Sequence, residues 1–170
     1  MQPYQTKNGC SNTPSLLCIL TLVLYLGIVA LHLTYIFTPI IKGIITTNPI
    51  LYILLALHFA LLAVIVYDYL WIMIHDPVDS IILDPQLADN IEDNKKQECR
   101  VCNKSRLIGS HHCSECGRCT EDFDHHCKYL NNCIGRKNYE KFVRLLSMNV
   151  IFHINVIGQG LWVFLKAIGN

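Results

Sequence analysis

Three long apolar stretches flank one polar stretch, and this alternation sets the expected architecture. Residues 16–37 contain no acid or base other than His32. At a rise of 1.5 Å per residue, a helix of this length spans about 33 Å, which matches a hydrocarbon core of roughly 30 Å. Residues 50–74 and 145–168 form two further apolar runs. The pattern predicts an α-helical, multi-pass integral membrane protein that spans the lipid bilayer with three helices.

Polar side chains interrupt the apolar runs, most often the third one. Because a polar group facing lipid is costly, we expect those of the third run to face other helices or a cavity. The histidines of the three runs are interpreted as hydrogen-bonded packing or interface residues. The side chains concerned are Asn149, His153, Asn155 and Gln159 in the third run, and His32, His58 and His153 among the histidines.

The segments between the apolar runs predict the topology. Residues 75–144 hold eleven of the fourteen Lys and Arg residues, which by the positive-inside tendency places this block in the cytosol. Residues 1–15 are then a cytosolic tail and residues 38–49 a lumenal loop. The core of the cytosolic domain is expected at 97–143. We find no internal repeat by inspection of the sequence.

Composition narrows the class of protein further. The chain is 52% hydrophobic with a mean hydropathy of +0.32, which is high for a soluble domain. A net charge of +1 gives no reason to expect a nucleic acid partner. Nine cysteines are present, and those interleaved with histidines suit zinc better than disulfides. Cys10 and Cys18 lie outside that cluster and are interpreted as a surface thiol and a small apolar helix residue.

Seven cysteines and four histidines lie between residues 99 and 133. They are Cys99, Cys102, His111, His112, Cys113, Cys116, Cys119, His125, His126, Cys127 and Cys133. Zinc prefers four Cys and His ligands, often with two of them in a Cys-x2-Cys pair. Six cysteines and two histidines would fill two Cys3His sites, and one thiol is left over. The spacing permits a sequential or an interleaved grouping, and a zinc-stabilised interaction module without chemistry is the alternative function.

The surplus thiol lies in the sequence Asp124-His125-His126-Cys127. A cysteine reacts as the thiolate, and a neighbouring imidazole can take its proton. His125 is therefore a candidate base for Cys127, with Asp124 orienting the imidazole. The other interpretation is that these residues are further ligands of one larger zinc array. Eight ligands already fill two four-ligand sites and leave one thiol spare, which opposes that interpretation.

These residues and spacings resemble the DHHC protein S-acyltransferases, which are also called palmitoyltransferases. Every spaced Cys and His of that family's cysteine-rich domain is present, and the similarity continues to Asn138 and Phe142. Two helices before this domain and one after it fit the family layout. Asp76-Pro77 resembles the start of the family's Asp-Pro-Gly element, and the resemblance covers about residues 16–168.

The resemblance implies two interleaved structural Zn²⁺ sites. One would use Cys99, Cys102, His112 and Cys119, and the other Cys113, Cys116, His126 and Cys133. Cys127 would be the acylated nucleophile, His125 its base and Asp124 the group that polarises His125. The implied reaction moves a palmitoyl-type group from acyl-CoA (palmitoyl-CoA), the co-substrate, to a cysteine of a membrane-associated protein. The implied location is the endoplasmic reticulum or Golgi, with the plasma membrane as an alternative.

The chain departs from the family pattern in three places that matter. The stretch before His112 is Leu107-Ile108-Gly109-Ser110, where the family usually has a proline-rich basic sequence. Lys128-Tyr129-Leu130 stands where many members have Pro-Trp after the nucleophile, and this resembles a subgroup with Lys-aromatic-Leu. The family's fourth helix is not present in these 170 residues. We expect that the gene product continues past Asn170 with at least one more span, and that the 170-residue chain alone is unstable or weakly active. The alternative is a catalytically inactive zinc-dependent membrane adaptor or a fragment.

Overall fold

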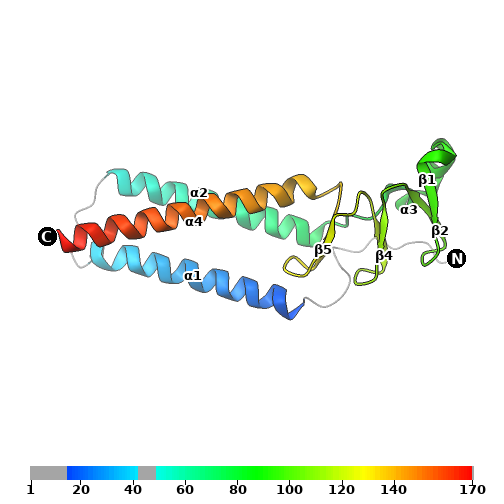
Figure 1. Ribbon diagram of the computed structural model, residues 1–170. Helices are drawn as coiled ribbons and strands as arrows, with labels where there is room; N and C mark the ends of the chain where they lie inside the picture. Colours follow the sequence, from blue (N-terminus) through cyan, green and yellow to red (C-terminus); the bar gives the residue numbers. More distant parts are fainter. Residues whose placement is uncertain (1–14, 42–48, 170) are drawn as a thin grey trace. The chain divides into compact units, whose positions relative to one another are not determined.

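Three long helices and a small cysteine-rich domain make up the described part of the chain, as the sequence predicts. The computed structural model describes residues 15–41 and 49–169. The long helices are α1 (Leu16–Ile41), α2 (Pro49–Ile74) and α4 (Tyr139–Ile168), labelled in Figure 1. Most of the expected tail and loop, residues 1–14 and 42–48, lies outside the described residues.

Two of these helices are longer than the apolar runs that predicted them. Helix α1 continues four residues past the expected end at Phe37, through Pro39, because a proline removes one backbone donor but need not end a helix. Helix α4 begins at Tyr139, six residues before the expected start. Its first two turns contain Glu140 and Arg144, so a search for apolar residues alone misses them.

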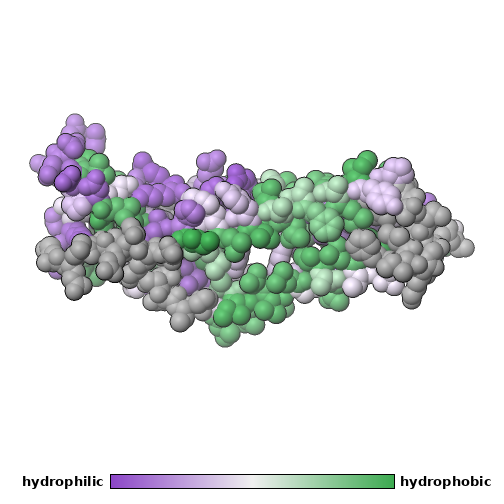
Figure 2. Space-filling model, turned by 180° about the vertical axis from the view of Figure 1, so that it is seen from behind, coloured by the Kyte–Doolittle hydropathy of each residue, from purple (hydrophilic) through white to green (hydrophobic). Residues whose placement is uncertain are grey.

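The chain divides into two compact units, and the first of these contains most of the helical length. It comprises Ile19–Asp68 and Arg144–Asn170. Its surface is largely hydrophobic, which Figure 2 shows in green over the long helices. Leu31, Ile53 and Ile157 are 72%, 67% and 68% exposed. Three helices of the described chain are long and apolar enough to cross a membrane, which explains why such side chains need no protein partner.

Polar side chains join the three helices within this unit. The Nε2 atom of His32 lies 3.1 Å from Oε1 of Gln159, and Nε2 of Gln159 donates to the carbonyl of Leu54 at 3.0 Å. The ring of His58 stacks on that of His32 with centroids 5.2 Å apart. The expectation for the histidines therefore holds for His32, which is buried and hydrogen-bonded.

The polar residues of the third apolar run do not all face inward. Asn155 and Gln159 are buried, as expected. His153 is exposed and its Nδ1 lies 2.6 Å from the carbonyl of Asn149, while Asn149 donates to the carbonyl of Leu145 at 2.8 Å. Both side chains form hydrogen bonds within their own helix. The expectation that the polar residues face other helices or a cavity was wrong for the exposed His153, whereas Asn149 is half-buried.

An ion pair ties α4 to α2 in the same unit. Arg144 donates from Nε and Nη2 to the two carboxylate oxygens of Asp68, at 2.7 and 2.5 Å. Asp68 is fully buried, whereas Arg144 is partly exposed. A forked pair of this kind fixes the geometry of both side chains.

The second unit comprises Met1–Cys18 and Tyr69–Val143 and contains all the strands. Short helical segments come first: α3 (Ser80–Leu83), η1 (Pro85–Asn90) and η2 (Asp93–Lys95). Six short strands follow and pair as three antiparallel hairpins. They are β1 (Lys96–Cys99) with β2 (Lys104–Leu107), β3 (His111–Cys113) with β4 (Arg118–Thr120), and β5 (His125–Cys127) with β6 (Asn132–Ile134).

The hairpins are packed mainly around sulfur. One buried cluster consists of Cys113, Cys116 and Cys133 against Phe123. A second consists of Val78, Ile82, Cys99 and Cys119 against Cys102. Clusters this small bury little apolar area, so the hydrophobic effect alone stabilises the hairpins weakly.

Candidate functional site

The three hairpins are copies of one unit, which corrects the expectation of no internal repeat. Cys99, Cys113 and Cys127 each end the first strand of a hairpin and are 14 positions apart. Three residues with positive φ occupy equivalent positions in the turns: Asn103 at 50°, Gly117 at 64° and Asn131 at 51°. Asparagine and glycine tolerate this conformation best, so the same backbone turn recurs three times. The regular spacing of the Cys-x2-Cys pairs was the sequence signal for it.

The first cluster of metal-ligand atoms takes two residues from each of two hairpins. Cys99 and Cys102 come from the turn of β1–β2, whereas His112 and Cys119 are cross-strand partners in β3–β4. The Sγ atom of Cys102 lies 3.2 Å from Nδ1 of His112 and 3.7 Å from Sγ of Cys119. All four donor atoms lie within 4.8 Å of one another.

The second cluster repeats this arrangement one hairpin further along. Cys113 and Cys116 come from the turn of β3–β4, whereas His126 and Cys133 are cross-strand partners in β5–β6. The Sγ atom of Cys116 lies 3.4 Å from Nδ1 of His126 and 3.3 Å from Sγ of Cys133. The structure thus brings the donors together in the interleaved grouping.

Both clusters fit a tetrahedral zinc ion. With Zn–S bonds of about 2.3 Å, the sulfurs of a tetrahedral site lie about 3.8 Å apart. The observed S–S separations are 3.7 Å in the first cluster and 3.3 Å in the second. Burial lowers the pKa of His126, which favours the neutral imidazole that a metal requires. His111, a further candidate, is exposed and belongs to neither cluster within the described residues.

Cys127 occupies the place in the third hairpin that a metal ligand occupies in the first two. The position three residues further along the chain, Cys102 or Cys116 in the other hairpins, is Leu130 here. Among the described residues, Cys127 joins neither cluster of ligand atoms. The surplus thiol inferred from the spacing is therefore the one in the hairpin that lacks a second cysteine.

Strand β5 arranges the Asp-His-His-Cys residues on two faces. Side chains alternate along a strand, so His125 and Cys127 share one face while His126 lies on the other, with the second cluster. The Nδ1 atom of His125 lies 2.8 Å from Oδ2 of Asp124. If Nδ1–H donates to this carboxylate, Nε2 is the free nitrogen that can accept a proton.

The environment of Cys127 favours the protonated thiol. Burial raises the pKa of Cys127, while hydrogen bonds from the backbone N–H groups of Leu130 and Tyr129 act in the opposite direction. Because burial is the larger effect, the thiol needs a neighbouring base to become a nucleophile at neutral pH. His125 is the imidazole on the same face of the strand.

A buried polar network beside the third hairpin was missed by sequence reasoning. Arg118 is only 1% exposed, and its Nε lies 3.1 Å from Oδ1 of Asp76. Its Nη2 also donates to Oδ1 of Asn132 at 2.8 Å, and Asn132 donates to the carbonyls of Ile72 and His75. Asn132 is the cross-strand partner of Cys127, so the network fixes the hairpin that carries the thiol.

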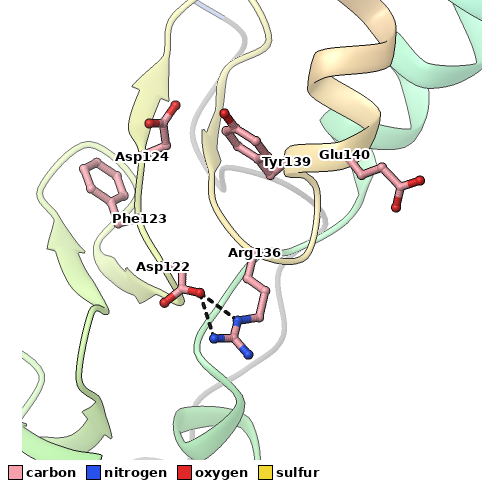
Figure 3. Close-up of a pocket in the computed structure, with 6 residues that line it drawn as sticks. All are labelled: Asp122, Phe123, Asp124, Arg136, Tyr139 and Glu140. Carbon is pink, nitrogen blue, oxygen red and sulfur yellow. Dashed lines mark hydrogen bonds and ion pairs between the residues drawn. The ribbon is translucent and has the colours of Figure 1, made fainter.

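A polar pocket of about 500 Å³ lies next to Asp124. Figure 3 shows its lining residues, with the carboxylate of Asp122 held by Arg136. Arg136 also pairs with Glu121 at 3.0 Å, and these carboxylates raise its pKa, Asp122 most strongly. The guanidinium is thus a fixed cation in the pocket wall. The lining residues are Asp122, Phe123, Asp124, Arg136, Tyr139 and Glu140.

Comparison with known proteins agrees with this geometry. Residues 92–170 match the family model for the DHHC palmitoyltransferases. This segment is a DHHC palmitoyltransferase domain. It contains the three hairpins and α4, so the resemblance drawn from the cysteine and histidine spacing is confirmed.

Curated relatives align over the same part of the chain. A probable protein S-acyltransferase 20 of Arabidopsis thaliana is 43% identical over 72 residues, which is 42% of this chain and 10% of the relative. The palmitoyltransferase ZDHHC5-A of Danio rerio is 46% identical over 63 residues, and human palmitoyltransferase ZDHHC8 is 44% identical over 63 residues. Each of these two alignments covers 37% of this chain and 8% of the relative. The chain thus spans a tenth or less of the length of these relatives.

Proposed function

We propose that the protein is a protein S-acyltransferase that carries its acyl group on Cys127. The observation that supports this most directly is the third hairpin, where one thiol occupies a ligand position without a second cysteine and shares a strand face with His125. The DHHC domain and the relatives named palmitoyltransferases support the same chemistry.

The first step forms the acyl-enzyme. His125 takes the proton of Cys127, and the thiolate attacks the thioester carbonyl of a long-chain acyl-CoA such as palmitoyl-CoA. The carbon–sulfur bond to CoA breaks, and the CoA thiolate takes up a proton from the imidazolium. Asp124 stabilises that imidazolium and holds the ring in one orientation.

The second step transfers the acyl group to the substrate. A cysteine thiol of a membrane-associated protein loses its proton to His125 and attacks the thioester of acyl-Cys127. Cys127 then leaves as the thiolate and is ready for another acyl-CoA. Three helices long and apolar enough to cross a membrane support an exchange near the bilayer, where acyl chains and lipid-anchored proteins meet.

The two clusters are proposed to hold structural zinc, one ion each. When bound, zinc supplies tetrahedral cross-links between neighbouring hairpins rather than a reacting group. The eight ligands are Cys99, Cys102, His112 and Cys119 in one site and Cys113, Cys116, His126 and Cys133 in the other. We place this domain in the cytosol, where reduced thiols persist, on a membrane of the endoplasmic reticulum or Golgi.

Substitution of two equivalent cysteines tests the proposal. Cys127→Ser should keep both zinc ions and lose hydroxylamine-sensitive acyl label, because Cys127 is not a ligand. Cys113→Ser, at the same place in the preceding hairpin, should lose a ligand, reduce bound zinc and destabilise the domain. Bound zinc and label from an alkyne-tagged acyl-CoA are measured on both variants. A full equivalent of zinc lost from Cys127→Ser would reverse the assignment, and label retained on that variant would exclude Cys127 as the nucleophile.

A further inference from the structure

A second thiol, that of Cys18, lies at the turn that follows Cys127. Ser15, just before α1, donates from Oγ to the carbonyl of Lys128 at 2.7 Å and accepts from the backbone N–H of Cys18 at 3.1 Å. The first turn of α1 is thereby attached to the residue next to Cys127. All of these residues belong to one compact unit of the chain.

A chain of hydrogen bonds continues from Cys18 to the same turn. The Sγ atom of Cys18 lies 3.3 Å from Oη of Tyr69, and Oη of Tyr69 donates to the carbonyl of Tyr129 at 3.3 Å. Since a phenol has one proton, and it goes to that carbonyl, the Cys18 thiol is the donor to Tyr69. The backbone N–H of Tyr129 in turn bonds to the sulfur of Cys127.

Cys18 is buried and is linked by hydrogen bonds to the turn that follows Cys127. It is 3% exposed, so reagents in bulk solvent reach it poorly. Contacts from Ser15, Tyr69 and the turn at residues 128–129 thus place a shielded thiol beside the proposed nucleophile.

We propose that Cys18 is a second acyl acceptor, which takes the acyl group from Cys127 within the same chain. This inference rests on the proposed acylation of Cys127. The sulfur of Cys18 attacks the carbonyl carbon of acyl-Cys127, a carbon–sulfur bond to Cys18 forms and the one to Cys127 breaks. The proton that leaves Cys18 ends on Cys127, so a thioester and a thiol change places and no other reactant is required.

Such an exchange has little thermodynamic preference, because one cysteine thioester replaces another. The acyl group is therefore shared between the two positions. A buried thioester at Cys18 is protected from water, which otherwise hydrolyses acyl-enzymes. Cys18 would thus hold a reserve of acyl groups that can return to Cys127, and it would free Cys127 for a second acyl-CoA.

Peptide mapping of autoacylated protein tests this inference. The 170-residue protein in detergent is incubated with alkyne-tagged palmitoyl-CoA, and the labelled cysteines are identified by mass spectrometry. We expect hydroxylamine-sensitive label on Cys127 and Cys18 and none on Cys10, whose peptide reports uncatalysed acylation. Cys127→Ser should lose both labels. Cys18→Ser should keep the label on Cys127, and the total label should fall by about half at saturation if each thiol holds one acyl group.

The other possible results would each contradict the inference, and one of them would also contradict the proposed function. Label on Cys127 without label on Cys18 in the unmodified protein overturns the inference and leaves the proposed function intact. Label on Cys18 that persists in Cys127→Ser overturns it too, because the acyl group then comes directly from acyl-CoA. A disulfide between the two cysteines in place of acyl-Cys18 would also contradict it. Absence of label on Cys127 itself contradicts the proposed function, and the inference with it.

Discussion

At the scale of single residues, chemistry is divided between neighbours that point in opposite directions. His126 and His125 are adjacent, yet strand β5 directs one to a cluster of ligand atoms and the other toward the face of Cys127. A strand achieves this separation without any turn between the two histidines. The spacing of cysteines and histidines predicted the ligand sets through the family resemblance, but it could not show this alternation.

Asp124→Asn should slow formation of acyl-Cys127 and leave zinc content unchanged. The carboxylate accepts a hydrogen bond from His125 at 2.8 Å, and an amide cannot stabilise the imidazolium by charge. We expect a decrease of about 10²- to 10⁴-fold in the single-turnover rate with acyl-CoA.

The neighbouring Asp122→Asn provides the control. Asp122 bonds to Arg136 rather than to His125, so the rate should change little. Equal losses in the two variants would assign the effect to the charge of the pocket instead of to the contact with His125.

At the scale of elements, the hairpins depend on one another through shared ligands and close backbone contacts. The turn of each of the first two hairpins supplies ligands that combine with a cross-strand pair of the next. Gly135, directly after β6, lies against the strand and turn at residues 120–122. A Cβ atom added at Gly135 would lie 2.4 Å from the carbonyl oxygen of Glu121 and 2.6 Å from Cγ2 of Thr120.

Gly135→Ala should therefore destabilise the hairpin domain. Backbone must move to accommodate the methyl group, and overpacking of this kind costs about 1–3 kcal/mol. Limited proteolysis of the zinc-loaded protein, followed over time, measures the effect on residues 96–134.

Gly158→Ala is the matched substitution. It lies in α4, where an added Cβ meets no described atom within 4 Å, so protease resistance should be unchanged or slightly higher. Similar susceptibility of the two variants would show that the contact at Gly135 relaxes without cost.

The long helices show where sequence patterns are informative and where they are not. Apolar length predicted α1, α2 and α4, because a membrane span must satisfy its backbone internally. Burial of Asn155 and Gln159, and exposure of His153, depend on which face of α4 meets its neighbours. A single sequence does not show how α4 is rotated about its own axis, so the polar residues of this run were given one common expectation. The contact of Gln159 with both α1 and α2 appears only in three dimensions.

Gln159→Leu should lower the thermal stability of the helical unit in detergent. The substitution removes hydrogen bonds to His32 and Leu54, each worth about 0.6 kcal/mol in membrane proteins, and leaves His32 without that partner. Melting is followed by loss of helical circular dichroism. His153→Leu, at an exposed position, should shift the melting temperature less, and an equal or larger shift there would contradict the importance of the interhelical contacts.

At the scale of the whole molecule, a membrane protein carries a thiol-rich domain that requires a reducing compartment. The polar block with eleven of the fourteen Lys and Arg residues contains all seven clustered cysteines. Both features favour the cytosolic placement that we propose for this block. The three long apolar helices of the described residues were predictable from hydropathy, whereas the side of the membrane rests on the charge of the polar block and on its thiols.

A membrane-impermeant maleimide tests this orientation in intact cells. After zinc is removed with a permeant chelator, the cysteines from Cys99 to Cys133 should react only when the plasma membrane is permeabilised and cytosolic proteins become accessible. Permeabilisation that leaves internal membranes sealed gives the control, because a lumenal domain would stay protected. Labelling without permeabilisation, or continued protection with the cytosol open, would refute the cytosolic placement.

Leu130, in the turn of the third hairpin, affects which cysteines can bind a metal ion. Two thiols separated by two residues bind soft metal ions as a chelate, and a single thiol on the same backbone binds them far less well. Leu130 is buried and has no donor atom in its side chain. In the proposed assignment, the reactive Cys127 therefore differs from Cys99 and Cys113 by one residue of its hairpin, Leu130 in place of a cysteine, and not by a different fold. Two metal ions bound to the other six clustered cysteines and to His112 and His126 would leave the thiol of Cys127 free for the proposed reaction.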